Sequence, residues 1–392
     1  MWAYGTKKSH SKSLQSIDIN RRHPSNGITR LNVKKPKIKS NEVLIKVKAS
    51  ALNYNSIWSA LSFPLSPFQL INRHVQRNPS DQDHLQDFAI YGSDAAGIIC
   101  DVGENVEQWK IGDEVIVHCN AVNNNDPIIQ KDGMLSNSQS IWGYETNFGA
   151  FSEYTKVRSS QLIKKPKDLS WEVAGSFCLT LSTAYRMLLS DNAFRISPND
   201  NCLIWGGSGG LGNFAIQLVN LVGANPIAVV STEEKAEQAI NLGSKIVINR
   251  KKESFGDFIL ENGEPNYLSW RKARKLLNSK GVEGIDYVFD HVGRETLSVS
   301  LFLLNRGGTI VTCAASSGYN AVIDLRYLWM SLKRIIGSHF ANYYEAKSAA
   351  NLVFSGQIKP LIYKVCPIKD LPKMADIMHK NANYGKIVFI HD

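Results

Sequence analysis

Alternation of hydrophobic and polar positions divides the chain into three parts. Between about residues 28 and 165, apolar residues recur at every second position in short runs, which predicts strands joined by turns. The clearest runs are 42–49, 112–117 and 151–157. From 201 to 340, short apolar runs alternate with amphipathic segments, and the tail returns to alternation at 385–390. The chain is therefore predicted to be strand-rich at both ends, with a mixed helix-and-strand middle.

The middle part predicts a doubly wound parallel sheet, because strands that alternate with helices pair in parallel. A long helix is expected at 172–190, and the polar stretch 251–280 predicts a long helical insertion. The expected strands are 202–205, 226–230, 245–248, 284–289, 308–313 and 334–338. The fold class is α/β.

A glycine motif follows the first strand of this sheet. Gly207, Gly209 and Gly212 form Gly-x-Gly-x-x-Gly, and apolar residues at helical spacing come directly after it. Strand, glycine turn and helix in this order form a dinucleotide-binding loop, in which the helix N-terminus faces the pyrophosphate. The expected cofactor contacts in the loop are Gly207, Ser208, Gly209, Gly210, Leu211 and Gly212.

The end of the next strand indicates which dinucleotide binds. An NAD site places a carboxylate there for the ribose 2′-hydroxyl. This chain has Ser231 at that position and Lys235 one helical turn later. A hydroxyl and a cation suit a 2′-phosphate, whereas Glu233 and Glu234 are more simply partners of a helix N-terminus. NADPH is the predicted cofactor.

Composition narrows the class of protein. The 392 residues are 43% hydrophobic and 20% charged, which is typical of a globular protein. A net charge of +10 comes from scattered basic residues, so a nucleic-acid site is not favoured. The six cysteines form no Cys-x-x-Cys pair, and there is neither a signal peptide nor an apolar run that would span a bilayer. A cytoplasmic protein with reduced thiols is expected.

The order of parts resembles the medium-chain dehydrogenase/reductase superfamily. Gly92-Ser93-Asp94-Ala95-Ala96-Gly97 and Gly112-Asp113-Glu114-Val115 carry this resemblance. It implies a GroES-like, β-rich catalytic domain interrupted by a Rossmann NADPH-binding domain. The expected boundaries are 1–167 with 345–392 for the first, and 168–344 for the second.

Zinc-dependent members of that superfamily carry a Cys within the stretch matching 51–53 and Gly-His-Glu where this chain has 92–94. Here these stretches read Ala-Leu-Asn and Gly-Ser-Asp, and a four-cysteine loop is absent from 119–142. Because zinc needs thiolate or imidazole ligands, chemistry without a metal is expected.

Three further segments resemble the enoyl-CoA carboxylase/reductase family: 53–58, 141–149 and 326–342. The resemblance implies NADPH-dependent reduction of a 2-enoyl-CoA with capture of CO2, to give an alkylmalonyl-CoA such as ethylmalonyl-CoA. Central carbon assimilation and the supply of polyketide extender units both stay open as its role. The resemblance also implies that Asn55, Glu145, His339 and the Tyr144–Glu145 peptide form the CO2 site. Tyr144 stands where the family usually has Phe, and its hydroxyl could protonate the enolate.

Other assignments follow the same resemblance. Thr183, Arg250 and His291 are expected to contact the cofactor. Arg326, Tyr327 and Lys333 could contact the CoA phosphates or adenine, with a structural role as the open alternative. A homo-oligomer, dimer or tetramer, is expected to form through edge strands of the nucleotide domain near 308–313.

Each candidate has a simpler interpretation when it is taken alone. Asn55 would be a turn residue, Glu145 a solvated loop carboxylate, and His339 a core residue after a buried strand. Trp142 and Trp329 would be packing residues, and Arg294–Glu295 a surface ion pair. Only the joint occurrence of the three segments favours catalysis.

Three other functions stay open. A zinc-free enoyl thioester reductase would protonate the enolate instead of carboxylating it. A quinone or alkenal reductase would not need the segment around His339. A nucleotide-binding protein without turnover would not need Asn55, Glu145 and His339 together.

Overall fold

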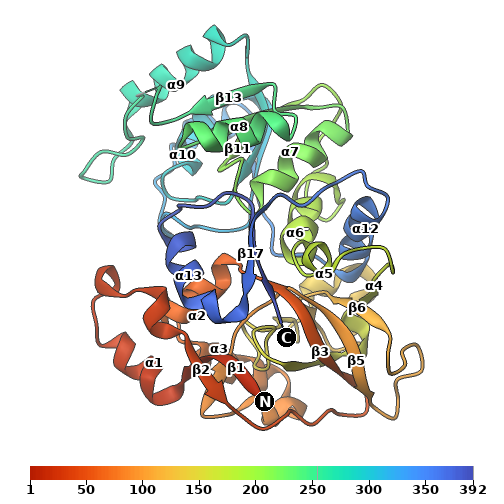
Figure 1. Ribbon diagram of the computed structural model, residues 1–392. Helices are drawn as coiled ribbons and strands as arrows, with labels where there is room; N and C mark the ends of the chain where they lie inside the picture. The colour runs from red at the N-terminus through yellow and green to blue at the C-terminus, as the bar shows by residue number, and fades with distance from the viewer. Residues whose placement is uncertain (254, 392) are drawn as a thin grey trace. The chain divides into compact units, whose positions relative to one another are not determined.

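The computed structural model describes residues 1–253 and 255–391, which form two compact units. One unit consists of 1–179, 341–354 and 360–392, and the other of 180–340 with 355–359. The first is therefore assembled from both ends of the chain, as the red and blue ribbons in Figure 1 show.

The first unit is built on β-sheets. Its seven-stranded sheet has the order β10-β6-β5-β3-β18-β17, with β9 paired to β3, and smaller sheets have the orders β2-β1-β4 and β7-β8. The strands are β1 (Trp2–Lys7), β2 (Thr29–Asn32), β3 (Glu42–Ala51), β4 (Phe88–Ile90), β5 (Ala95–Val102), β6 (Glu114–Val117), β7 (Asn120–Ala121), β8 (Ser140–Ile141), β9 (Tyr154–Arg158), β10 (Leu162–Lys164), β17 (Ile362–Pro367) and β18 (Lys386–Ile390).

Helices also occur in this unit, and those within 28–165 lie where the sequence predicted only strands and turns. They are α1 (Lys8–Gln15), α2 (Tyr54–Leu61), α3 (Pro67–Arg77), α4 (Ile129–Asp132), α5 (Trp171–Ala174), α12 (Tyr343–Phe354) and α13 (Leu371–His379). The start of α3 has a readable signal: Ser66 and Gln69 form a reciprocal capping box around Pro67. The prediction for 28–165 was wrong in omitting α2 and α3.

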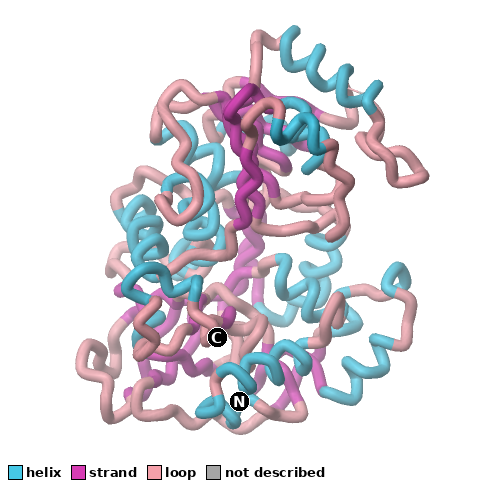
Figure 2. The backbone as a smooth tube through the Cα atoms, turned by 180° about the vertical axis from the view of Figure 1, so that it is seen from behind, coloured by secondary structure: helices cyan, strands magenta, loops and turns pink. Residues whose placement is uncertain are grey.

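The second unit contains the predicted parallel sheet. Its strands have the order β13-β12-β11-β14-β15-β16, and all neighbours pair in parallel. They are β11 (Asn201–Trp205), β12 (Asn225–Val230), β13 (Ile246–Asn249), β14 (Ile285–Asp290), β15 (Leu304–Thr312) and β16 (Arg334–Gly337). Figure 2 shows strands of this unit as a magenta column with helices beside it. The α/β fold class is confirmed.

Two predicted helices are shorter than expected. The helix expected over 172–190 is divided into α5 and α6 (Cys178–Leu189) at Gly175, because a Cβ there would lie 2.8 Å from Ala49. Among the described residues of 251–280, only α9 (Tyr267–Ser279) is helical. The stretch also contributes Phe258 and Trp270 to an apolar core, so it is not simply polar. The indole N–H of Trp270 donates to Phe258 O within this core.

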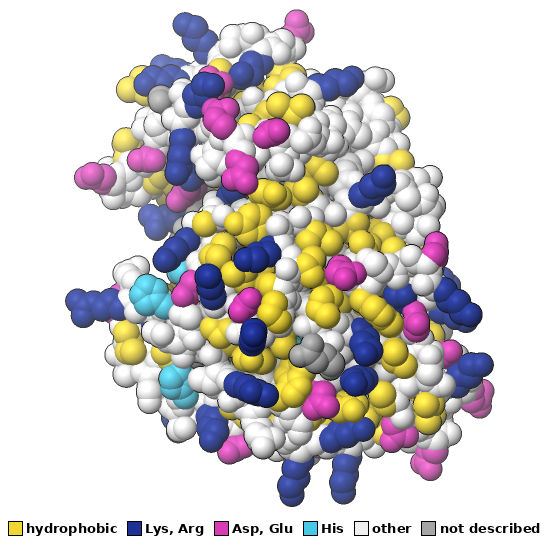
Figure 3. All heavy atoms as spheres, in the orientation of Figure 1, with side chains coloured by type: hydrophobic (Ala, Val, Ile, Leu, Met, Phe, Trp, Pro, Cys, Tyr) yellow, Lys and Arg dark blue, Asp and Glu magenta, His cyan; other side chains and the backbone are white. Residues whose placement is uncertain are grey.

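The remaining helices of the second unit are α7 (Gly212–Leu221), α8 (Glu233–Asn241), α10 (Leu297–Leu303) and α11 (Leu325–Trp329). No described helix is both long and apolar enough to cross a membrane. On the face drawn in Figure 3, the Lys and Arg side chains are spread out and mixed with acidic ones. The net charge of +10 is thus not gathered into one patch on this face.

Candidate active site

The glycine loop lies between β11 and α7. A Cβ on Gly207 would lie 2.7 Å from the Cβ of Ala228, and one on Gly212 would clash with the carbonyl oxygen of Gly206. The side-chain amide of Asn213 donates to the carbonyl oxygens of Gly209 and Gly210 at 2.9 and 2.8 Å. These oxygens are therefore engaged at the start of α7, where a pyrophosphate would meet N–H groups. Sequence reasoning did not identify Asn213.

The end of β12 has an excess of positive charge. The Thr232 hydroxyl caps α8 by accepting from the backbone N–H of Lys235. Lys235 itself is a buried residue. Burial lowers the pKa of Lys235; Glu234 opposes this shift, and the charges of Lys251 and Arg250 add to it. Ser231, half-buried, precedes the cap. A phosphate placed here would gain from the surplus cations, so the residues fit a 2′-phosphate.

The neighbouring carboxylates have partners of their own. Glu233 accepts from the side-chain amide of Asn249 at 2.9 Å and lies 3.4 Å from the Lys252 ammonium. Glu295 lies 3.6 Å from the guanidinium of Arg250. The expected Arg294–Glu295 pair is replaced by this one, because Glu295 is directed to the end of β13. The exposed Arg250 could exchange Glu295 for a phosphate.

His291 lies beside the glycine loop. A Cβ on Gly206 would lie 3.0 Å from its ring, and its Nε2 is buried without a hydrogen-bond partner among the described residues. Burial lowers the pKa of His291, against the charge of Asp290. The contact of this ring with a cofactor stays a prediction. Thr183, on α6, is also buried in this unit.

Two of the predicted CO2 residues share the first unit. Asn55 is buried in the first turn of α2 rather than in a turn, and its amide donates to Ser93 Oγ at 2.9 Å. Glu145 follows β8, and its carboxylate accepts from the N–H of Ile141 at 2.8 Å. The rings of Trp58 and Tyr144 lie 6.4 Å apart, which connects α2 with the loop that carries Glu145.

The backbone near Glu145 forms a tight turn after β8. The N–H of Glu145 donates to Ile141 O at 2.7 Å, and that of Tyr144 donates to the same oxygen at 3.2 Å. Both N–H groups therefore have an acceptor within the turn. The roles of the Tyr144–Glu145 peptide and of the Glu145 carboxylate stay predictions.

His339 belongs to the second unit, directly after β16. It is exposed, and its ring lies 4.7 Å from that of Phe340. The alternative of a core histidine after a buried strand is wrong, because β16 is the last strand of the sheet and is half-exposed. Trp142 is buried as expected, but Trp329 is 66% exposed and is not a packing residue.

The candidate CoA residues have structural contacts. The Lys333 ammonium donates to Leu301 O at 2.7 Å, and its pKa is lowered to about 8 by burial and by the charge of Arg274. The Tyr327 ring lies 5.4 Å from Phe302 within the core. Arg326 is exposed and donates twice to Asp324. These contacts favour the structural alternative for Tyr327 and Lys333, and only Arg326 projects into solvent.

At 51–53 and 92–94, where zinc-dependent members of the superfamily carry ligands, the structure places the buried ammonium of Lys386. The amide of Asn53 donates to Asp94 at 2.9 Å, and the Lys386 ammonium donates to both Asn53 and Asp94. Burial lowers the pKa of Lys386, and Asp94 opposes this shift. Because the Lys386 ammonium pairs with the Asp94 carboxylate and Asn53 offers neither thiolate nor imidazole, the described residues at 51–53 and 92–94 provide no ligand set for zinc. Sequence reasoning did not find Lys386, which is far away along the chain.

We therefore expect purified protein to contain no stoichiometric zinc and to keep its activity in chelator. Elemental analysis of the native chain checks this, with a zinc-dependent alcohol dehydrogenase as positive control. One tightly bound zinc per chain would contradict the interpretation of Asn53, Asp94 and Lys386.

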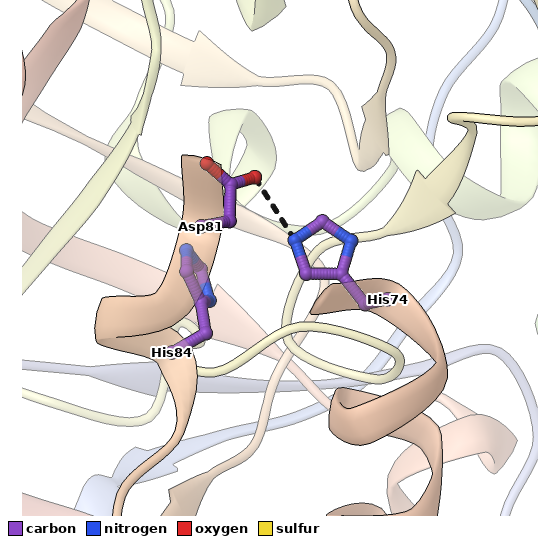
Figure 4. A group of neighbouring side chains, drawn as sticks. All are labelled: His74, Asp81 and His84. Carbon is purple, nitrogen blue, oxygen red and sulfur yellow. Dashed lines mark hydrogen bonds and ion pairs between the residues drawn. The ribbon is translucent and has the colours of Figure 1, made fainter. Parts of the chain in front are cut away.

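A second cluster has the composition of a metal site. His74, Asp81 and His84 are buried with one potential ligand atom each within 4.8 Å of the others (Figure 4). The Asp81 carboxylate, however, is already held by Lys39 at 2.7 Å and Arg158 at 2.9 Å. Burial alone would raise the pKa of Asp81, but hydrogen bonds from His74 and Lys39 and the charge of Arg158 hold it far below its usual range. A divalent cation would have to displace these groups, so the cluster does not fit a metal.

Comparisons with known proteins agree with this geometry. The family described as alcohol dehydrogenase GroES-like domain matches residues 39–167, and the one described as zinc-binding dehydrogenase matches 210–355. A crotonyl-CoA reductase of Streptomyces avermitilis is 41% identical over 97% of this chain and 85% of its own. A crotonyl-CoA carboxylase/reductase of Cereibacter sphaeroides is 42% identical over 91% of this chain and 82% of its own. The solved complex of the 2-octenoyl-CoA carboxylase reductase CinF with NADP and 2-octenoyl-CoA has a TM-score of 0.94, at 37% identity, and covers 99% of this chain and 87% of CinF.

Proposed function

The chain belongs to the crotonyl-CoA carboxylase/reductase family, and from this premise we propose that it converts a 2-enoyl-CoA and CO2 into an alkylmalonyl-CoA. When bound, NADPH supplies the hydride that adds to the β carbon. The observation that carries the proposal is the similarity to CinF, whose structure holds NADP and an enoyl-CoA, over nearly the whole chain. The glycine loop and the surplus cations around Lys235 support the choice of cofactor.

The two units divide the work in this proposal. The second unit, with Gly207–Gly212, binds the cofactor, and the first holds Asn55 and Glu145 for CO2. After reduction the α carbon of the enolate attacks CO2, whose oxygens become negative. The Asn55 amide can donate to those oxygens, and Glu145 can orient a water. For His339 the donor role stays a prediction from the resemblance.

A non-carboxylating reductase is the second candidate. Two similar proteins are named crotonyl-CoA reductase without mention of carboxylation. Tyr144 supplies a hydroxyl, and a proton from it would convert the enolate into the saturated acyl-CoA.

Labelled bicarbonate distinguishes the two. The chain is incubated with NADPH and enoyl-CoAs of four to eight carbons, and both label incorporation and NADPH oxidation are measured. Fixed label in an alkylmalonyl-CoA supports carboxylation. NADPH oxidation with a saturated acyl-CoA as sole product would show the simple reductase, and no oxidation would show that enoyl-CoAs are not the substrates.

We also propose a homo-oligomer, through a different strand from the one expected. The predicted strand at 308–313 corresponds to β15, which lies between β14 and β16 and has no open edge. The edge strands of this sheet are β13 and β16, and exposed apolar side chains precede β16 in the chain. These are Leu325, Trp329, Met330 and Leu332, exposed by 63, 66, 55 and 62%. A second copy that extends the sheet at β16 would bury them.

We expect the wild-type chain to be a dimer or tetramer at micromolar concentration, and Trp329→Glu to shift it towards monomer. Light scattering measures both, with the exposed Ile240→Glu on α8 as a control for added charge. A monomeric wild type, or a Trp329→Glu variant with unchanged mass, would refute this interface.

A cytoplasmic location is proposed on the state of the thiols. All six cysteines are unpaired in the structure, and burial raises the pKa of Cys119, Cys178 and Cys202. Unpaired buried thiols are typical of a reducing compartment.

A further inference from the structure

A buried chain of hydrogen bonds runs from Asp81 through His74 to Ser140. His74 Nε2 lies 3.0 Å from the Asp81 carboxylate, and Nδ1 lies 2.9 Å from Ser140 Oγ. The side-chain amide of Asn78 also approaches Nδ1, at 3.3 Å. The Asp81 carboxylate accepts from His74 Nε2–H, and the Ser140 hydroxyl shares the second hydrogen bond with Nδ1. A hydroxyl oxygen has two lone pairs, so Ser140 Oγ can accept from a further donor whichever group donates across the His74 contact.

The residues of this hydrogen-bonded series, Asp81, His74 and Ser140, are those of a hydrolytic triad, but their geometry does not allow that function. Ser140 is 0% exposed and His74 1% exposed, so a substrate carbonyl has no access to the hydroxyl. Ser140 is also paired in β8, opposite Ala121. The chain of bonds holds a strand in place rather than activating a nucleophile.

The hydrogen-bonded series continues from Ser140 to Glu145. The Arg77 guanidinium, one turn after His74 on α3, donates to Ser140 Oγ at 3.3 Å. The same nitrogen, Nη2, lies 3.7 Å from Oε1 of Glu145. The other carboxylate oxygen, Oε2, accepts from the N–H of Ile141, the residue after Ser140. Both oxygens of Glu145 are thus held by groups that Ser140 orients, either directly or through its neighbour.

The Glu145 side chain stays 19% exposed, so it is held without being sealed from a ligand. We propose that His74, Ser140 and Arg77 are positioning residues that fix the Glu145 carboxylate for carboxylation. Asp81, locked by Lys39 and Arg158, is the fixed end of the chain. The proposal rests on the proposed function, because it assigns a role within the CO2 site.

The test compares Ser140→Ala and Arg77→Gln with the control Arg73→Gln. Ser140→Ala removes one hydroxyl and no volume beyond it, so its folding risk is small. Arg73 is an exposed arginine on the same helix, and within the described residues its side chain makes no ion pair or hydrogen bond with Glu145. The readout is the ratio of labelled ethylmalonyl-CoA to butyryl-CoA formed from crotonyl-CoA, NADPH and labelled bicarbonate.

We expect Ser140→Ala and Arg77→Gln to lower that ratio roughly tenfold, because a misplaced carboxylate weakens the carboxylation step. Arg77→Lys should lower the ratio less than Arg77→Gln does, and Arg73→Gln should leave it at the wild-type value. In a Glu145→Ala background, Arg77→Gln should change the ratio no further, since the partner is gone.

Two results would overturn the proposal. The first is a wild-type ratio in both Ser140→Ala and Arg77→Gln. The second is an equal loss of both products, which would indicate general support of the fold. A wild-type chain that oxidises NADPH without fixing label would instead refute the carboxylase function, and with it this role for Glu145.

Discussion

Replacing Glu145 by alanine should redirect product from alkylmalonyl-CoA to the saturated acyl-CoA while NADPH is still consumed. The same shift is expected for Asn55→Leu and His339→Asn. Hydride transfer needs the nicotinamide and the β carbon, whereas carboxylation also needs donors at the CO2 oxygens. Loss of one such donor typically costs about 10²-fold in the step that it serves. The unprotected enolate is then protonated instead.

Measurement of both products with labelled bicarbonate checks this shift, and Tyr144→Phe provides the opposite control. If the Tyr144 hydroxyl supplies protons, its removal should increase the labelled fraction. Equal loss of both products in Asn55→Leu, Glu145→Ala and His339→Asn would mean that these residues support binding or folding, and the CO2 assignment would be wrong.

Lys235→Ala should reduce kcat/KM for NADPH by about ten- to a hundredfold and leave that for NADH almost unchanged. The Lys235 ammonium lies where a 2′-phosphate is expected, among the charges of Arg250 and Lys251. A hydrogen bond to a charged group contributes about 1.5–3 kcal/mol, which corresponds to this loss. NADH has no 2′-phosphate and so cannot lose the contact.

Steady-state kinetics with both cofactors measure the effect, and Lys252→Ala is a matched control because Lys252 pairs with Glu233. Equal kcat/KM for NADPH and NADH in the wild type would contradict the preference. An equal decrease for both cofactors in Lys235→Ala would assign Lys235 to the stability of α8 rather than to the phosphate.

Local patterns predicted the cofactor-binding half of this protein well. A glycine motif between an apolar run and an amphipathic helix needs only neighbouring residues, and β11, the loop and α7 lie where expected. The helix α2 was missed because most of its side chains are buried and show no clear period. The helix α3 does show the helical period, with Leu70, Ile71, His74 and Val75 buried, and the Ser66–Gln69 box marks its start, but the prediction overlooked both signals. Gly175 divided a continuous helical pattern because of a contact with β3 that no local pattern carries.

The candidate site was harder to predict for the same reason. Resemblance identified Asn55 and Glu145, but not their partners Ser93 and Arg77. Lys386 and Asp94 are separated by 292 positions, and only the pairing of β18 with β3 brings them together. The hydrogen bond of the Glu145 N–H depends on a tight turn, which backbone geometry reveals and residue types do not.

The position of β18 between β3 and β17 has a consequence for how the chain acquires its structure during synthesis. Ile387, Val388 and Phe389 are fully buried in the sheet whose other strands are mostly made some 200–350 residues earlier. The parallel sheet of the second unit is complete well before these residues leave the ribosome, so it can fold first. Until β18 arrives, β3 lacks a neighbour and Asp94 lacks its ammonium partner. The first unit must therefore wait until β18 has been synthesised, and such late, non-local pairing is intrinsically slow.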